Sequence, residues 1–263
     1  MLKQDSIQSG TTSGALKKVV IMIPTYNEKD NIENLIREIE ALRPKTEKLG
    51  KALTILVVDD NSPDGSAQIV QTLSKEFDNI ILNIRTKKRG RGSAGTDGFK
   101  QALELGADFV IEMDADFSHH PRHIPELLVA ADTSDVVLGS RFIPGGADKD
   151  RGLYRQTVTK LAGIYVRTLL KLGIRDVSSG YRCFSRKALE TLDLENLIST
   201  GPSIVLEILY KCVMKGLSIK EVPIIFIDRR QGITKLNWVT LLETLVMVLR
   251  LRDLKNRRQL LTL

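Results

Sequence analysis

The sequence predicts an α/β fold, a three-layer sandwich with helices on both faces of a mainly parallel sheet and a C-terminal helix. Two observations lead to this prediction. Short apolar runs rich in Val, Ile and Leu alternate with segments whose apolar residues recur every three or four positions, which is typical of β-α-β units. The 263 residues, of which 42% are hydrophobic, can bury one large core.

The first half of the chain supplies most of the predicted sheet. Pro24 ends the first apolar run, and the turn-forming residues 59–65 follow the second. The expected strands are 19–23, 53–58, 80–84, 108–113 and 135–138. The expected helices are 32–42, 66–77, 94–105 and 124–130. Strands joined through helices run parallel, so binding residues should lie on the loops that follow the strands.

From Gly152 onward the pattern changes. The expected elements are a helix over 156–172, a loop over 175–185, a helix over 203–215, a strand over 219–227 and a last helix over 236–255. We find no internal repeat and no linker-like composition. The predicted organisation is a flexible tail over 1–16, one domain over 17–240, and an amphipathic, basic C-terminal helix and tail over 236–263.

Two acids, Asp114 and Asp116, stand one residue apart at the end of the strand over 108–113. The carboxyl end of a buried parallel strand is where open α/β sheets place their ligands. Two carboxylates there suit Mg²⁺ or Mn²⁺, which usually also bind substrate phosphates, so a nucleotide diphosphate is the expected ligand. The alternative is an acidic loop without a metal, because Asp-x-Asp is common by chance.

The formal net charge of +7 and the pI of about 9.4 favour polyanionic partners such as nucleic acid, anionic lipid or phosphorylated substrates. No apolar run reaches the roughly 18 residues that a membrane-spanning helix needs. Cys183 and Cys212 lie far apart without a histidine pair nearby, which predicts reduced thiols in a cytosolic setting and no structural zinc.

Motifs after four of the predicted strands resemble those of glycosyltransferase family 2, whose members have the Rossmann-like GT-A fold. Within that family, they resemble the dolichol-phosphate (polyprenol-phosphate) mannose synthases. The matching segments are Pro-Thr-Tyr-Asn-Glu at 24–28, Val-Val-Asp-Asp-Asn-Ser-Pro-Asp-Gly at 57–65, Asp-Ala-Asp-Phe-Ser-His-His-Pro at 114–121, Gly-Ser-Arg-Phe at 139–142, Ser-Gly-Tyr-Arg at 179–182, and 228–235. The first two are general to the superfamily, whereas the third is specific to the synthase group.

The resemblance implies inverting transfer of mannose from GDP-mannose to dolichyl or polyprenyl monophosphate, giving β-mannosyl phosphoryl polyprenol and GDP for protein glycosylation. It implies Mg²⁺ or Mn²⁺ held by Asp114 and Asp116. It assigns the nucleotide sugar to Pro24, Tyr26, Asn27, Glu28, Val58, Asp60, Lys88, Asp114, Ala115, Asp116, Arg141, Arg229 and Lys235. It assigns the acceptor phosphate to Arg141, Arg155 and Thr159, and catalysis to Asp116 and Arg141.

These assignments agree with side-chain chemistry. Carboxylates accept from guanine N–H groups and ribose hydroxyls, a tyrosine stacks on a base, and arginine binds phosphate in bidentate fashion. Arg229 and Lys235 match a mobile loop that closes over the diphosphate, with Gly232 to let it fold. For Lys88, within the basic segment 87–92, a solvated basic turn is an equal alternative.

The chain departs from the family pattern at two places. Ser118 stands where many archaeal members carry a glutamine as a further metal ligand, and serine is too short to reach equally far. The Ser-His-His-Pro version resembles the eukaryotic type. We interpret His119 and His120 as structural or loop-orienting residues. The second departure is the segment 87–92, which is more basic than the usual apolar-interspersed loop.

The C-terminal segment combines apolar residues with a basic cluster over 250–258. Such a helix either packs on the core or lies in a membrane interface, where each basic residue contributes ~1 kcal/mol near an anionic surface. We therefore expect a protein bound peripherally to a membrane surface. The family resemblance implies that it is cytoplasmic and that this membrane is the endoplasmic reticulum in a eukaryote or the plasma membrane in a prokaryote. It also implies small membrane-anchoring subunits as possible partners.

Two other functions stay open at the level of sequence. A related enzyme could transfer a sugar from a UDP-sugar to polyprenyl phosphate. A basic scaffold or nucleic-acid-binding protein could have kept the fold without catalysis. Against the second, the acids of the strand-end motifs are intact, and the chain lacks the interleaved aromatic and basic residues that stack bases, so we expect no nucleic acid partner.

Overall fold

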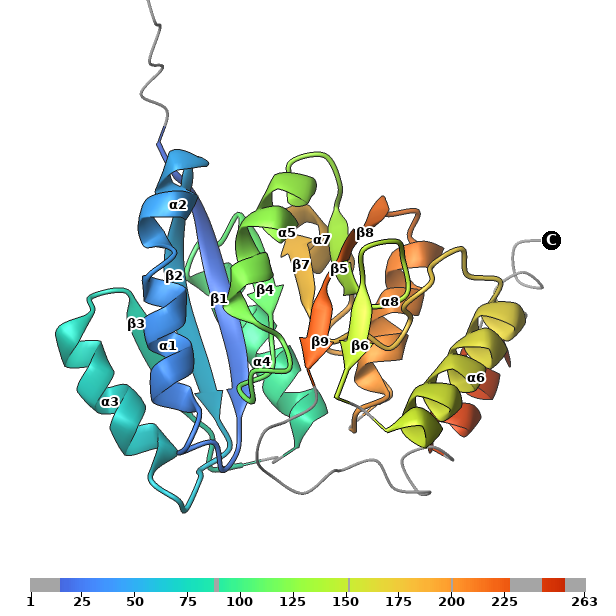
Figure 1. The fold of residues 1–263 in the computed structure, drawn as a ribbon, viewed down its shortest axis with the longest axis horizontal. Helices are drawn as coiled ribbons and strands as arrows, with labels where there is room; N and C mark the ends of the chain where they lie inside the picture. Colours follow the sequence, from blue (N-terminus) through green and yellow to red (C-terminus); the bar gives the residue numbers. More distant parts are fainter. Residues whose placement is uncertain (1–14, 88–89, 151, 200, 228–242, 254–263) are drawn as a thin grey trace, which may run out of the picture.

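A computed structural model describes residues 15–87, 90–150, 152–199, 201–227 and 243–253. Seven strands form one sheet in the order β3-β2-β1-β4-β7-β5-β8 (Figure 1). They are β1 Lys17–Thr25, β2 Lys51–Asp59, β3 Ile80–Ile84, β4 Phe109–Glu112, β5 Val136–Ser140, β7 Arg182–Ser185 and β8 Ile219–Pro223. β7 runs antiparallel to β4 and β5, and the other neighbouring pairs are parallel. The predicted mainly parallel sheet is confirmed.

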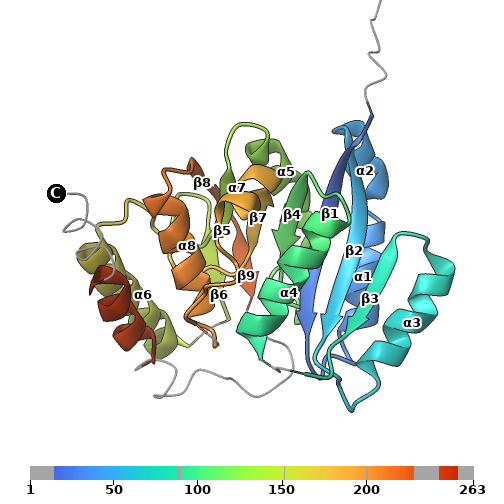
Figure 2. The same ribbon diagram turned by 180° about the vertical axis from the view of Figure 1, so that it is seen from behind.

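Helices cover both faces of this sheet, as predicted (Figures 1 and 2). On one face lie α1 Ile32–Glu40, α3 Ser66–Glu76 and α5 Ile124–Ala131, and on the other lie α4 Arg91–Glu104, α7 Arg186–Thr191 and α8 Ile204–Met214. A short helix, α2 Arg43–Lys48, follows α1, and the 3₁₀ turn Pro121–His123 precedes α5. The helix α6, Leu153–Leu170, lies beyond α8 at the end of the molecule.

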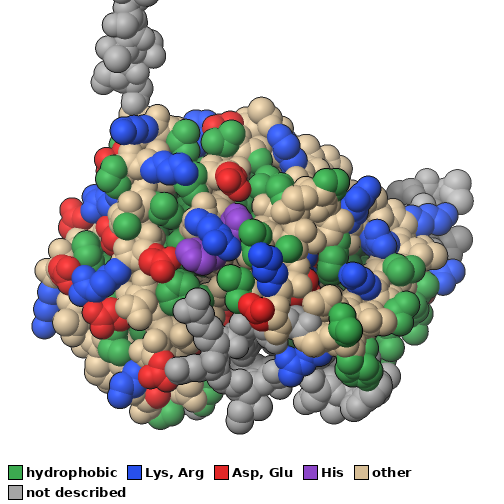
Figure 3. Space-filling model, viewed as in Figure 1, with side chains coloured by type: hydrophobic (Ala, Val, Ile, Leu, Met, Phe, Trp, Pro, Cys, Tyr) green, Lys and Arg blue, Asp and Glu red, His purple; other side chains and the backbone are tan. Residues whose placement is uncertain are grey.

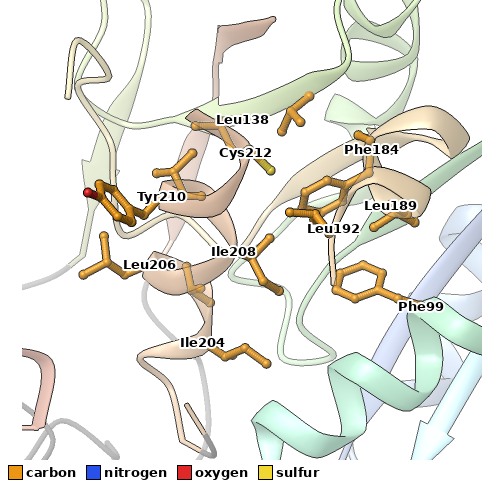
Figure 4. Close-up of a cluster of buried hydrophobic side chains, with 14 of the residues drawn as sticks. Phe99, Leu138, Phe184, Leu189, Leu192, Ile204, Leu206, Ile208, Tyr210 and Cys212 are labelled. Carbon is orange, nitrogen blue, oxygen red and sulfur yellow. The ribbon is translucent and has the colours of Figure 1, made fainter. Parts of the chain in front are cut away.

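Alternate residues of the central strands enter two separate cores. Ile21 and Ile23 of β1 pack with the α1 side, and Met22 packs with the α4 side. A Cβ at Gly98 of α4 would lie 2.7 Å from Met22 Cγ, so α4 can approach β1 this closely only because residue 98 is glycine. Phe99 meets the ring of Phe184 edge-on at 5.3 Å, among the α7 and α8 side chains of Figure 4.

Three local predictions were wrong. The expected loop over 175–185 contains β7, a four-residue strand that the sequence hides because Arg182 and Ser185 break its apolar pattern. The expected strand over 219–227 is two strands, β8 and β9 Ile225–Ile227. β9 pairs with β6, Ala147–Lys149, in a small second sheet. The expected helix over 32–42 ends at Glu40, and α2 begins after a break.

The C-terminal helix is described over 243–253 and lies beside α6 in both views (Figures 1 and 2). Met247, Val248 and Leu251 join the core, whereas Val246 and Leu249 are exposed. Core packing is therefore correct for one side of this helix. The rest of the expected helix over 236–255, the basic residues beyond 253 and most of the predicted tail over 1–16 lie outside the described residues. The domain boundaries stay a prediction.

Candidate active site

The carboxyl ends of β1, β2, β4 and β5 lie along one edge of the sheet, because these strands are parallel (Figure 1). The loops after β1 and β2 are fastened to each other there. The backbone N–H groups of Asn27 and Glu28 donate to the hydroxyls of Ser62 and Ser66, both at 3.0 Å. Lys29 N donates to Asp64 Oδ2 at 3.0 Å. The two predicted loops therefore form one fixed surface.

Carboxylates inside the second loop hold its shape. Asp59, which is fully buried, accepts from the backbone N–H and the hydroxyl of Ser62, both at 2.7 Å. Burial alone would raise the pKa of Asp64, but hydrogen bonds from Ser66 and Lys29 outweigh it and hold the pKa below its usual value. The dense turn sequence thus serves as a scaffold for the neighbouring site.

Asp114 and Asp116 follow β4 directly, as the sequence predicts. Asp116 is buried, and its Oδ1 accepts from the backbone N–H of Ser118 at 3.1 Å and from its hydroxyl at 2.6 Å. Ser118 is itself buried. Its hydroxyl orients the Asp116 carboxylate, so the residue that departs from the archaeal pattern supports the predicted metal-binding side chain through a hydrogen bond.

His119 supports the loop that carries Asp114 and Asp116, which we call the acidic loop. The backbone N–H of Asp114 donates to His119 Nδ1 at 2.9 Å, and the imidazole stacks on Tyr181 with ring centroids 5.0 Å apart. Burial lowers the pKa of His119, outweighing the nearby carboxylates of Asp114 and Asp116, which would raise it. A neutral ring whose Nδ1 accepts a hydrogen bond fits this contact. His119 thus binds the backbone of the loop after β4, as a loop-orienting residue would.

Arg91 is a site residue that the sequence analysis did not assign. It is the first residue of α4, and its Nη1 donates to Asp114 Oδ1 at 2.9 Å while Nη2 lies 3.7 Å from Glu112 Oε1. Burial alone would lower the pKa of Arg91, but the carboxylates of Asp114, Glu112 and Asp116 raise it above its usual value. The unusually basic segment 87–92 was the signal that could have identified it.

A cavity of about 440 Å³ lies against these loops, and we call it the strand-end cavity. The predicted nucleotide-sugar residues that line it are Pro24, Tyr26, Glu28, Asp60, Asp114, Ala115 and Asp116. The carboxylate of Asp60 accepts from Arg85 Nη1 and from Gly90 N, which ties the start of α4 to this wall. Val58 lies in the core instead, with its side chain packed near Gly98. Seven predicted residues thus meet at one place.

A second cavity, of about 310 Å³, adjoins the first, and we call it the helix cavity. Its apolar walls come from α6, α8 and the loop before β7: Val158, Ala162, Val166, Val177, Val205 and Leu206. Its polar end carries Arg141, Ser178 and Ser179. Arg91, Asp114 and Pro202 line both cavities, so the two spaces meet beside the acidic loop.

Arg141 is held rigidly at the polar end of the helix cavity. Its Nε and Nη2 donate to the two carboxylate oxygens of Asp176 at 2.8 and 2.7 Å, and Nη2 also donates to Ser178 Oγ at 2.6 Å. Burial alone would raise the pKa of Asp176, but the hydrogen bonds and charge of Arg141 hold it below its usual value. Asp176 is a positioning residue that the sequence analysis missed.

The remaining predicted residues fall into three groups. Thr159 lines the helix cavity from α6, and Arg155 lies one turn earlier on the same helix. Asn27 lies in the loop after β1, with positive φ of 58°. Lys88, Arg229 and Lys235 lie outside the described residues.

Asp114 and Asp116 are chemically suited to hold a divalent cation. Both carboxylates line the strand-end cavity, and Asp114 already faces a cationic group in Arg91. Within the described ranges, no three His, Cys, Asp or Glu side chains form a metal-binding group. Two carboxylates without a third protein ligand suit Mg²⁺ or Mn²⁺, which complete their coordination with water and substrate phosphates.

Comparison with known proteins identifies the family. The family model "Glycosyl transferase family 2" matches residues 20–193. The chain belongs to this family. It is 34% identical over 248 residues to the polyprenol monophosphomannose synthase of Mycolicibacterium smegmatis, covering 94% of this chain and 91% of that protein. It is also 34% identical over 233 residues to the undecaprenyl-phosphate mannosyltransferase of Micrococcus luteus, covering 89% and 93%.

Solved structures support the fold of this family member. Glucosyl-3-phosphoglycerate synthase from Mycobacterium tuberculosis, crystallised with Mn²⁺, UDP and phosphoglyceric acid, matches with a TM-score of 0.67 at 17% identity, over 90% of this chain and 78% of that one. Mannosyl-3-phosphoglycerate synthase from Rubrobacter xylanophilus matches with a TM-score of 0.59 at 18% identity, over 93% and 75%. The predicted GT-A fold is confirmed.

Proposed function

We propose that this glycosyltransferase moves mannose from GDP-mannose to a polyprenyl or dolichyl monophosphate, with inversion, and releases GDP. The junction of the two cavities carries the proposal. The strand-end cavity offers acids and Tyr26 to a nucleotide, and the helix cavity offers apolar walls behind an arginine and two hydroxyls. An acceptor with a phosphate head and a hydrocarbon chain matches the helix cavity, because the head would meet the arginine and hydroxyls and the chain would lie along the apolar walls. The names of the two 34% identical relatives support the same acceptor class.

The proposed donor site uses residues that the structure places around the strand-end cavity. Glu28 and Asp60 would accept from guanine N–H groups and ribose hydroxyls, and the exposed ring of Tyr26 would stack on the base. Mg²⁺ or Mn²⁺ at Asp114 and Asp116 would neutralise the charge that develops on the diphosphate. We assign Arg229 and Lys235 to the same diphosphate, as the sequence motif implies.

The proposed acceptor site explains how transfer proceeds without a general base. A phosphate monoester carries roughly 1.5 to 2 negative charges near neutral pH, so its oxygen is already a competent nucleophile. Arg141, fixed by Asp176, would hold this phosphate at the cavity junction, with Arg155 and Thr159 on α6 as further contacts. Attack from the face opposite the diphosphate breaks the anomeric C–O bond, forms the new one and inverts the configuration.

The surface around the helix cavity suits a membrane-bound acceptor. α6 presents Leu153, Tyr154 and Leu161 to solvent with 83%, 69% and 61% exposure, while its other side lines the cavity. Figure 3 shows hydrophobic side chains gathered over α6 with basic ones beside them. No helix among the described residues is long and apolar enough to span a bilayer. We therefore propose peripheral attachment through α6 and the C-terminal helix.

One assay tests the proposed reaction directly. The protein is incubated with labelled GDP-mannose, Mn²⁺ or Mg²⁺ and a short polyprenyl phosphate, and the organic phase is counted. We expect label in the organic phase and a β-linked mannosyl phosphate by NMR. A parallel reaction with UDP-glucose should give much less product. Transfer from the UDP-sugar but not from GDP-mannose, or no transfer to the lipid at all, would refute the proposal.

A further inference from the structure

Arg91 occupies an unusual position for a cation. It is the first residue of α4, where the positive end of the helix dipole disfavours a basic side chain. It also stands between the two cavities and lines both of them. A basic residue placed against the helix dipole at such a junction is expected to have a function that compensates for its cost. The reaction proposed above assigns no function to Arg91.

The contacts of Arg91 show which groups it serves. Nη1 donates to Asp114 Oδ1, and Nη2 lies 3.7 Å from Glu112 Oε1. Glu112 is buried, and its Oε2 has no hydrogen-bond partner among the described residues. The Arg91 side chain is 26% exposed, so its guanidinium keeps access to the cavities. Arg91 is therefore bound to a carboxylate that the cation site needs, beside a second carboxylate that could retain it.

A divalent cation and this guanidinium compete for the same carboxylate. At hydrogen-bond range in a partly buried site, two like charges repel far more strongly than in water. A cation that binds Asp114 and Asp116 therefore weakens the hold of Asp114 on Arg91. Glu112, which lies near the Nη2 end of the Arg91 guanidinium, does not line the strand-end cavity and can keep the arginine nearby.

We propose that Arg91 is an exchangeable counter-ion: it neutralises Asp114 before the cation binds, and afterwards its guanidinium turns to the acceptor phosphate in the helix cavity. The acceptor half of this inference rests on the proposed function, whereas the counter-ion half does not. Two consequences follow. Arg91 lowers the affinity of the free protein for the cation, and the bound cation raises the affinity for the acceptor. By linkage, the bound acceptor then raises the affinity for the cation by the same factor.

Cation binding is measured first, without nucleotide or acceptor, by the electron paramagnetic resonance of free Mn²⁺ during titration. Arg91→Leu removes the competing charge and should bind Mn²⁺ about fivefold more tightly than the unmodified protein. Lys75→Leu removes the same charge at an exposed position in the last turn of α3, the end of that helix away from the strand-end loops, and should change the affinity less than about twofold. Equal or weaker Mn²⁺ binding by Arg91→Leu would overturn the counter-ion role.

A second variant moves Arg91 without removing its charge. A Cβ at Gly180 would lie 2.8 Å from Arg91 Nη2, and the backbone of Gly180 has no positive φ that would strain alanine. Gly180→Ala should therefore push the guanidinium away and also tighten Mn²⁺ binding. If Arg91→Leu fails to fold, this variant decides: unchanged or weaker Mn²⁺ binding in a folded Gly180→Ala protein contradicts the proposal.

Acceptor binding is measured next, by calorimetry with a short polyprenyl phosphate, with and without Mn²⁺ and GDP. The unmodified protein should bind the acceptor about fivefold more tightly when Mn²⁺ and GDP are present, and Arg91→Leu should lose this enhancement. Enhancement that persists in Arg91→Leu refutes the acceptor contact. If the unmodified protein binds no polyprenyl phosphate at all, the proposed function and the acceptor contact fail together, and the Mn²⁺ titration alone judges the counter-ion role.

Discussion

The two cavities are built in different ways. Around the strand-end cavity, buried carboxylates and serine hydroxyls fix the loops after β1 and β2 through hydrogen bonds. Around the helix cavity, α6 buries only Val166 and Leu170 of its 18 residues, and its apolar walls make few polar contacts. Arg141 with Asp176 is the exception, a rigid ion pair at the polar end of an otherwise apolar space.

This difference corresponds to what each cavity would bind. A nucleotide presents donors and acceptors at fixed positions, and recognition of such a ligand depends on polar groups that are held in place before it arrives. A hydrocarbon chain offers no such groups, so an apolar wall suffices and its exact shape matters less. We therefore expect single substitutions around the strand-end cavity to reduce activity severely and those around the helix cavity to reduce it mildly. Arg141 should be the exception, because its replacement should be as severe as one around the strand-end cavity.

The largest effect should come from Asp116→Ala. This change removes one of two proposed cation ligands, and we expect the rate of transfer to fall by about 10²–10³-fold while the fold is kept, because the residue lies in a loop. Initial rates over a range of Mn²⁺ concentrations measure the loss. Ser118→Ala is the matched control, since it removes only the hydrogen bond that orients Asp116, and its loss should be smaller. Full activity of Asp116→Ala in the presence of a chelator would contradict the assignment.

Arg141→Met tests the rigid ion pair of Arg141 with Asp176 at the polar end of the helix cavity. We expect transfer to fall by about 10²-fold because the proposed contact that fixes the acceptor phosphate would be lost. Stability should fall by about 3–5 kcal/mol because Asp176 is left buried and unpaired. The double variant Arg141→Met with Asp176→Asn separates the two effects: urea unfolding should show part of the stability restored, whereas transfer should stay low. Restored transfer in the double variant would show that Arg141 acts only as a structural partner.

The same ion pair should give the protein an acid-sensitive stability. Burial alone would raise the pKa of Asp176, but Arg141 holds the folded pKa below the ordinary value of an aspartate. The pair therefore stabilises the fold fully above that ordinary value and loses its effect as pH falls through the lower folded pKa. Urea midpoints from pH 7 down to about pH 3 measure this. Asp176→Asn should be less stable at pH 7 and should lose less stability on acidification. If both proteins lost stability equally steeply on acidification, other carboxylates would be responsible for the acid sensitivity.

A smaller effect is expected on the apolar side of α6. Leu161→Ser should weaken binding to anionic vesicles roughly fivefold, by about 1 kcal/mol of lost apolar burial, and should leave transfer to a short water-soluble acceptor unchanged. Val129→Ser on α5 is the matched control, because Val129 is also exposed but lies on another face. Removal of residues 254–263, which keeps the buried Leu251 and deletes three of the five basic residues of the 250–258 cluster, should likewise reduce vesicle binding more than activity. Equal loss of both properties would mean that these segments support the fold.

Much of the sheet was predictable because its strands are apolar runs between clear turn signals. The strand over 80–84 has the predicted bounds, and the ends of β1, β2 and β4 fall where the polar motifs begin. β7 was not predictable in the same way. Its four residues include a buried arginine, and its place between β4 and β5 depends on long-range pairing that no local pattern records.

The residues of the candidate site show the same contrast between local sequence patterns and long-range packing. Acids that follow strands, such as Asp60 and Asp114, were found because parallel strands bring their ends together. Asp176 and Arg91 were missed because each acts through a partner distant in the sequence, Arg141 and Asp114 respectively. The ion pairs depend on how α4 and the loop before β7 pack, and side-chain type alone does not reveal that packing.

The smallest effect on the pH dependence of transfer is expected from His119, which lines the helix cavity, and from its neighbour His120. These two imidazoles are the side chains that a missed general base would involve. Burial lowers the pKa of His119, and its Nδ1 already accepts from Asp114 N, so this atom is not available to take a proton from an acceptor. His120 caps the following turn by accepting from Arg122 N at 3.3 Å. Since the proposed phosphate nucleophile would already be ionised, His119→Ala and His120→Ala should each keep the wild-type dependence of kcat/KM on pH. His119→Ala should lower the rate at all pH values alike, because the acidic loop loses its support. A variant whose rate loses the acid limb, with unaltered substrate binding, would identify that histidine as a base and would place the chemistry on the protein instead of on the acceptor phosphate.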